Sequence, residues 1–84
     1  ENAVARRVAD LLEIDIKLVW SPGKNRLIVK ARSLFCYWLV SESGLSMSQL
    51  ARQLGLSVTA ISQSVERGRR IVAEEKFSFD KVKL

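Results

Sequence analysis

The segment from Arg26 to Glu42 constrains the fold more than any other part of this sequence. Its apolar side chains recur every three or four residues and form two adjoining rows: Leu27, Ala31, Leu34 and Trp38 in one, and Ile28, Phe35 and Leu39 in the other. This spacing predicts an α-helix, and an apolar face of this width is typical of a helix with neighbours on several sides. We therefore expect a central helix here, ended by Gly44, with the rest of the chain packed around it.

The part of the chain before this helix is predicted to hold one further long helix. Apolar residues at helical spacing from Val4 to Leu12 predict a helix over residues 2–13. Residues 14–20 are apolar on one side, which fits either a helix of one or two turns or an extended link. Residues 21–25 contain a Pro-Gly pair and form the clearest loop in the sequence.

Capping signals divide the second half of the chain into two helices. Ser46 opens the first of them, and Gln49 three residues later completes a capping box. Gly55 ends this helix, because glycine adopts the left-handed backbone of a tight turn without a steric penalty. Ser57 can cap the following helix, which we expect to run to about residue 67 or past Gly68 to residue 72.

The chain is predicted to form one domain, residues 1–73, followed by a tail, residues 74–84. Eighty-four residues can bury one modest core, and 48% apolar with 27% charged residues are typical of a globular chain. In the tail Phe77 alternates with Phe79, which fits a short docking strand or a frayed end. The expected fold class is all-α, a compact bundle of about five helices.

Positive charge is concentrated in the middle of the chain. The net charge is +5, from 14 Lys and Arg against 9 Asp and Glu. Residues 24–70 hold eight basic and two acidic residues, a balance of +6, whereas the rest holds six basic and seven acidic residues, a balance of −1. Such a stretch suits a polyanion, either nucleic acid or an anionic membrane surface. A basic domain without a polyanion partner is the alternative.

Several classes of function are disfavoured by what the sequence lacks. There is no His and only one Cys, Cys36, which excludes a zinc finger, a Ser-His or Cys-His nucleophile pair and an internal disulfide. The longest apolar run, residues 34–40, is too short to span a membrane, and no signal peptide is evident. We expect a cytoplasmic chain that is not an enzyme and has no metal, no other cofactor, no small-molecule substrate and no membrane span.

Residues 47–66 match the spacing of a helix-turn-helix. Small or apolar residues occupy its expected core positions: Leu50, Ala51, Leu54, Leu56, Ile61 and Val65. An ordinary helical hairpin with a glycine turn is the alternative. Short polar groups on the outer face of the second helix favour a DNA-binding unit, because a merely solvated helix more often carries Glu and Lys there.

The expected contacts with double-stranded DNA follow from position in this unit. The start of the second helix should enter the major groove, where Val58 can touch a thymine methyl group and Gln63 can pair with adenine at two points. The residues expected to read bases are Ser57, Val58, Thr59, Ser62 and Gln63. The residues expected to contact the DNA backbone are Ser46, Ser48, Arg67 and Arg70.

The order of these segments resembles the DNA-binding domain of the bacterial replication initiators, the DnaA family. Ala31 and Arg32 followed by Leu39 resemble its A-R-x-x-x-x-x-x-L helix, and the likeness covers residues 3–72. It implies the fold of the Trp repressor and DnaA domain IV, with a basic loop in the minor groove and an arginine on a phosphate. Carried over, the loop role falls on Lys24 or Arg26, and the phosphate role on Arg32. Asn25, between the two loop candidates, is a further expected contact with the DNA backbone.

The reading helix departs from that family. The initiators open it with Asp-His-Thr-Thr, whereas this chain has Ser57, Val58, Thr59 and Ala60 after a turn that is one residue shorter. Because the Asp and His are missing, we expect this chain to recognise a different DNA site.

A closer likeness is to the C-terminal domain of transposase-like proteins associated with repetitive extragenic palindromes, relatives of the single-tyrosine transposases. There a segment similar to residues 31–38 leads into a helix-turn-helix similar to residues 50–55. The nuclease domain of those proteins uses a tyrosine and a metal-binding His pair. This chain has no His, so Tyr37 is expected to be a core residue and the nuclease domain to lie outside this chain.

The likeness implies a DNA-targeting accessory domain of a larger transposase-like protein, associated with the bacterial nucleoid. Two alternatives stay open: a small helix-turn-helix transcriptional regulator, and a helical protein-interaction domain that binds no DNA. The sequence leaves the oligomeric state open as well.

Overall fold

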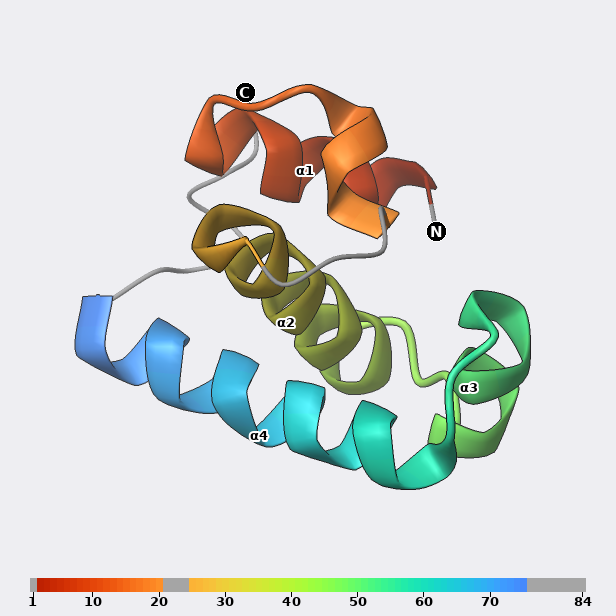
Figure 1. Ribbon diagram of the computed structural model, residues 1–84. Coiled ribbons are helices and arrows are strands. Elements are labelled where there is room, and N and C mark those ends of the chain that lie inside the picture. The colour runs from red at the N-terminus through yellow and green to blue at the C-terminus, as the bar shows by residue number, and fades with distance from the viewer. Residues whose placement is uncertain (1, 21–24, 76–84) are drawn as a thin grey trace.

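The computed structural model describes residues 2–20 and 25–75, and all of its regular elements are helices. In chain order they are α1 (Asn2–Leu12), the short 3₁₀ helix η1 (Ile16–Trp20), α2 (Arg26–Ser41), α3 (Met47–Leu54) and α4 (Val58–Glu75) (Figure 1). The all-α prediction is confirmed, with four α-helices and one 3₁₀ helix where about five helices were expected. The predicted loop at residues 21–24 and the tail at residues 76–84 lie outside the described residues.

The helix α2 is the centre of the bundle, as its wide apolar face predicted. It lies between α1 with η1 on one side and α4 on the other, and α3 lies beside the start of α4 (Figure 1). Five members of the predicted rows are buried: Ala31, Leu34, Phe35, Trp38 and Leu39. The prediction is wrong for Leu27, which is 40% exposed, because this first-turn residue lines an open groove rather than the core.

The termini of the helices follow their capping signals. Ser46 Oγ accepts from the Gln49 N–H at 3.1 Å while Gln49 Oε1 accepts from the Ser46 N–H at 3.1 Å, so the capping box is confirmed. Gly55 has a left-handed φ of 69°, and Ser57 Oγ accepts from the Ala60 N–H at 3.0 Å. These local bonds fix a turn of three residues between α3 and α4.

The core positions predicted for residues 47–66 are occupied with one exception. Leu50, Ala51 and Ile61 are buried, while Leu54 and Val65 are half-buried against the core. The prediction is wrong for Leu56, which is 36% exposed. Its backbone N–H bonds to the Ala51 carbonyl at 2.9 Å, so hydrogen bonds rather than a buried side chain hold this turn.

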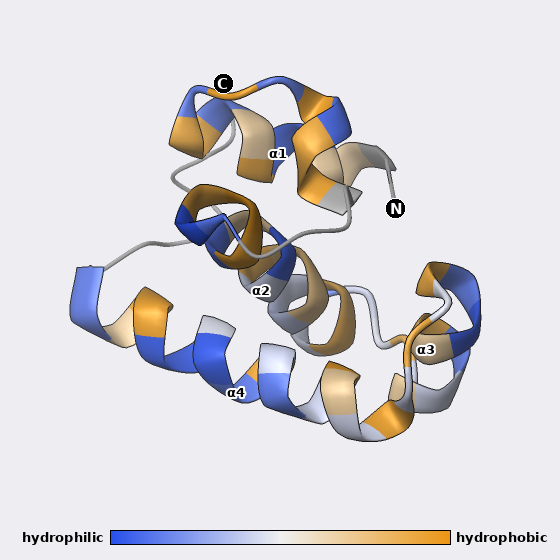
Figure 2. Cartoon of the chain, viewed as in Figure 1, coloured by the Kyte–Doolittle hydropathy of each residue, from blue (hydrophilic) through white to orange (hydrophobic). Residues whose placement is uncertain are grey.

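The helix α4 is longer than predicted. It passes Gly68 and ends at Glu75, so it takes up two residues of the segment predicted as the tail. Figure 2 shows hydrophilic and hydrophobic residues alternating along α4, as expected of a helix with one packed face. Ile71 and Val72 are half-buried against the core and extend this packed face beyond Gly68.

Candidate nucleic-acid interface

The five side chains predicted to read bases lie together at the start of α4. Ser57, Val58, Thr59, Ser62 and Gln63 are all exposed, and Val58 is 49% exposed although it is apolar. Ile61 and Ser64, on the packed face of the same helix, are buried. Thr59, Ser62 and Gln63 point away from this packed face on a helix of 3.6 residues per turn, while Ser57, the residue before α4, and Val58 are exposed at its N-terminal end.

Charged residues continue the same face toward the middle of α4. Glu66, Arg69 and Arg70 are exposed and follow Ser62 and Gln63 at helical spacing. Arg69 Nε donates to Glu66 Oε1 at 3.1 Å, and Arg69 also forms an ion pair with Glu66 Oε2. This hydrogen bond lowers the pKa of the Glu66 carboxyl below its usual range.

Glu66 was not among the predicted site residues, although its position three residues after Gln63 and four after Ser62 places it on their face. A carboxylate at this position repels phosphate, but it can accept a hydrogen bond from the amino group of cytosine. Ser62, Gln63, Glu66, Arg67 and Arg70 line an open hollow of about 510 Å³ on α4. Arg67 is half-buried and borders this hollow on the side toward α2.

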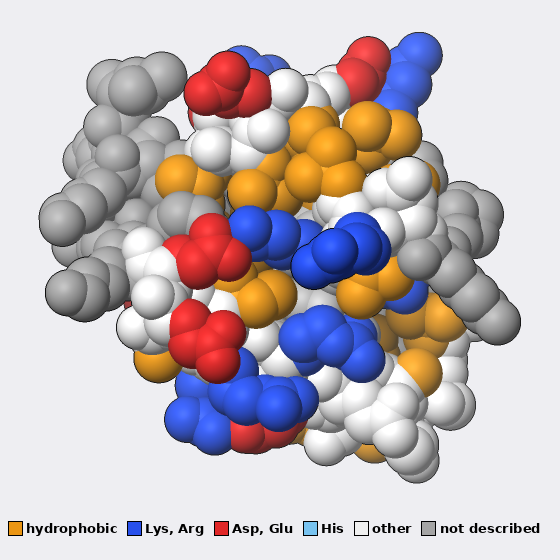
Figure 3. Space-filling model, turned by 60° about the vertical axis from the view of Figure 1, so that its left-hand side comes forward, with side chains coloured by type: hydrophobic (Ala, Val, Ile, Leu, Met, Phe, Trp, Pro, Cys, Tyr) orange, Lys and Arg blue, Asp and Glu red, His pale blue; other side chains and the backbone are white. Residues whose placement is uncertain are grey.

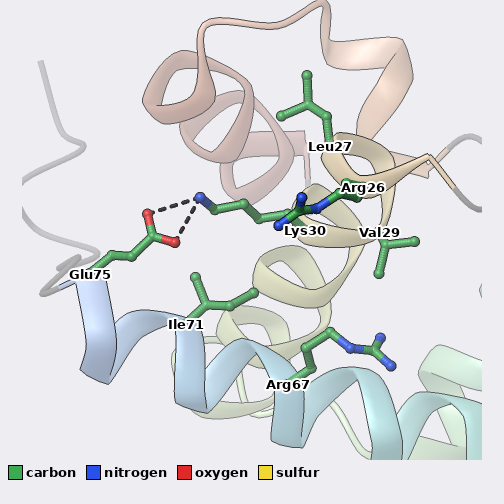
Figure 4. Close-up of a pocket in the computed structure, with 7 residues that line it drawn as sticks. All are labelled: Arg26, Leu27, Val29, Lys30, Arg67, Ile71 and Glu75. Carbon is green, nitrogen blue, oxygen red and sulfur yellow. Dashed lines mark hydrogen bonds and ion pairs between the residues drawn. The ribbon is translucent and has the colours of Figure 1, made fainter.

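A second hollow, an open groove of about 630 Å³, lies between the start of α2 and the end of α4 (Figure 4). We call it the α2–α4 groove; its lining residues are Arg26, Leu27, Val29, Lys30, Arg67, Ile71 and Glu75. Lys30 Nζ lies 2.8 Å from Glu75 Oε2 and 2.9 Å from Glu75 Oε1. Figure 3 shows Lys and Arg side chains gathered on one face of the molecule, with acidic and apolar side chains between them.

The structure brings together only some of the predicted backbone contacts. Arg26 and Arg67 line the α2–α4 groove, whereas Arg32 is half-buried and is near enough to Cys36 to lower the pKa of its thiol. The sequence did not identify Lys30 as a candidate, because only the fold brings it beside Glu75 and into the same groove as Arg67.

The other predicted backbone contacts have varied surroundings. Asn25 is exposed and caps α2, since its Oδ1 accepts from the Leu27 N–H at 2.9 Å. Ser48 is exposed in the first turn of α3. The Ser46 N–H already donates to Gln49 in the capping box, so this N–H can bind a phosphate only if that hydrogen bond breaks. Arg70 is exposed, and Lys24 lies outside the described residues.

The one cysteine and the tyrosine of α2 lie within the bundle. Cys36 is fully buried, and desolvation raises the pKa of its thiol to about 11, an effect that the positive charge of Arg32 reduces. The thiol is therefore protonated at neutral pH. Tyr37 is half-buried and packs against the core, with its Cβ close to Gly68 of α4.

Two further findings concern residues 2–20 and 25–75. No three acidic, His or Cys side chains in this part of the chain are grouped so that they could hold a metal ion. None of the helices in these ranges is both long enough and apolar enough to cross a membrane.

No protein-family model, no curated protein and no solved structure matches this chain. The resemblance to DnaA-type domains is therefore a prediction from the sequence, and the residues of the chain itself carry the functional proposal.

Proposed function

We propose that this chain binds double-stranded DNA through α3 and α4, acting as a helix-turn-helix with the start of α4 in the major groove. The observation that carries the proposal is the exposed face at the start of α4, where Ser57, Val58, Thr59, Ser62 and Gln63 lie together. Hydroxyl and amide groups can bond to base edges, and the exposed Val58 suits a thymine methyl group. A three-residue turn with Gly55 in the left-handed region precedes this face, and a turn of this length often contains glycine in such a unit.

The distribution of charge supports DNA over a neutral partner. Beyond the polar start of α4, Arg67, Arg69 and Arg70 follow along the helix, and Arg26 lies across the α2–α4 groove. Cations that flank a short polar face can position the DNA backbone while the polar groups contact the bases. In this proposal Glu66 is a further base-reading residue, because its carboxylate can accept a hydrogen bond from the amino group of cytosine.

A protein-interaction domain without DNA binding is the alternative, and the surface gives it less support. Large hydrophobic side chains that are exposed in the described part of the chain are Leu27, Leu56 and Val58. Leu27 belongs to the α2–α4 groove, and only Leu56 and Val58 lie near one another, at the turn before α4. Protein interfaces usually centre on a larger continuous apolar patch.

The place of this domain in a larger protein rests on sequence resemblance alone. We propose that it is the DNA-targeting part of a transposase-like protein, with a small transcriptional regulator as the alternative. A nuclease segment with a His-hydrophobe-His pattern in the same polypeptide would support the first and contradict the second.

The test of DNA binding is fluorescence anisotropy with a labelled mixed-sequence duplex at about 50 mM salt, where even non-specific binders show micromolar affinity. We expect binding that weakens steeply with salt, followed by enrichment of a preferred sequence from a randomised pool. Arg70→Ala should weaken binding to all sequences alike. Arg6→Ala, which removes the same charge from an exposed position on α1, across α2 from α4, is the matched control. An absence of duplex binding at micromolar protein would contradict the proposal.

A further inference from the structure

The α2–α4 groove combines three cations with one acid. Arg26 and Lys30 reach it from the first two turns of α2, and Arg67 reaches it from α4 (Figure 4). Arg67 Nη1 donates to Ser33 Oγ at 3.5 Å, and Ser33 is fully buried, so this guanidinium has an anchor in the core. Among the described residues that line the groove, Glu75 is the only acid, and a groove with this charge balance attracts an anion.

Glu75 forms an ion pair with Lys30 in this groove, and an anion from outside the chain can displace the Glu75 carboxylate. The side chains of Lys30 and Glu75 are 30% and 42% exposed, so water screens their attraction. Exposed ion pairs of this kind contribute little to stability. A phosphate can therefore replace the carboxylate on Lys30 at small cost to the fold.

The groove is continuous with the proposed DNA-binding face. Arg67 lines both the α2–α4 groove and the hollow that Ser62, Gln63 and Arg70 line on α4. A DNA strand whose bases meet the start of α4 therefore has its flanking backbone within reach of Arg67, and Lys30 lies in the same groove.

We propose that a phosphate of the DNA backbone binds Lys30 in the α2–α4 groove in place of Glu75, and that Glu75 thereby lowers the affinity of the domain for DNA. Arg26 and Arg67 line the same groove and add positive charge to it. The contact is independent of sequence, because phosphates carry no base information. This inference rests on the proposed DNA binding, which it extends with a new contact residue and an internal competitor for it.

The experiment measures duplex binding by anisotropy for the full chain, using a mixed-sequence duplex over a series of salt concentrations. Glu75→Gln should tighten binding about twofold to fivefold at low salt, because it removes the competitor. Glu74→Gln is the matched control, since it removes the same charge from the neighbouring exposed residue, which does not line the groove. Lys30→Gln should weaken binding about threefold to tenfold and lower the slope of log K against log salt by about one.

The double variant Lys30→Gln with Glu75→Gln makes the test specific. If Glu75 acts by occupying Lys30, the gain from Glu75→Gln should vanish when Lys30 is absent. Equal gains from Glu75→Gln and Glu74→Gln, or an undiminished gain in the Lys30→Gln background, would overturn the groove proposal and leave DNA binding standing. If the unaltered chain does not bind the duplex, the proposed function itself is overturned. Thermal unfolding by circular dichroism verifies that each variant is folded.

Discussion

The close crossing of α2 and α4 predicts that Gly68→Ala destabilises the domain, although alanine is the better helix former. Gly68 is buried in the middle of α4 against α2. A Cβ atom there would overlap the Ser33 carbonyl oxygen and would lie 2.7 Å from Tyr37 Cβ and 2.9 Å from the Ser33 carbonyl carbon. Two of these three atoms belong to the backbone of α2, so the clash cannot be relieved by a side-chain rotation and the helices must separate.

The size of the effect follows from two opposing terms. Overpacking of this kind costs about 1–3 kcal/mol, and the involvement of backbone favours the upper end. The higher helix propensity of alanine returns about 1 kcal/mol. The net loss of about 2 kcal/mol corresponds to a fall in Tm of about 8–16 °C for a domain of this size.

Thermal and urea unfolding followed by circular dichroism measure this loss. Ala73→Gly is the matched control, because Ala73 is exposed in the last turn of the same helix and reports helix propensity alone, a loss of at most about 1 kcal/mol. A Gly68→Ala variant that is as stable as the parent, or more stable, would refute the close approach of α2 and α4 at this point.

Three further predictions concern α1, the buried thiol and base reading. Glu13 has a left-handed φ of 57°, so Glu13→Gly should stabilise the domain by about 0.5–1 kcal/mol, and an unchanged or lower Tm would argue against that backbone. Burial raises the Cys36 pKa from 9.0 to about 11, so the unfolded chain releases this proton first. The free energy of unfolding should therefore fall as the pH rises through this window, by about 3 kcal/mol in total. Urea titrations at several pH values should show a smaller fall for Cys36→Ala, and an equal fall would contradict the assignment. Gln63→Ala should relax the preference at one base pair at a cost of about 1–3 kcal/mol, measured on the selected sequence and on single-base variants of it. A uniform loss on all sequences would mean that Gln63 does not read a base.

The sequence by itself determined where most helices begin and end, because those signals act over a few residues. The hydrogen bonds of the Ser46–Gln49 capping box and of the cap at Ser57 join residues three positions apart. The left-handed backbone at Gly55 is equally local, so the order of residue types along the chain is enough to predict all three. The exposed group at the start of α4 followed in the same way from helical spacing. Helical spacing also places Glu66 on that face, so the sequence held a signal for this residue although it was not among the predicted site residues.

The length of α4 and the contacts between α2 and α4 were decided only by the tertiary structure. The sequence allowed α4 to end near Gly68, because glycine often ends a helix. In the fold this glycine is needed where the two backbones meet, and the helix continues to Glu75. The pairing of Lys30 with Glu75 joins residues 45 positions apart, and Arg67 reaches Ser33 across 34 positions. Contacts of this range depend on the angle and distance between packed helices, which no local pattern encodes, so the α2–α4 groove was visible only in three dimensions.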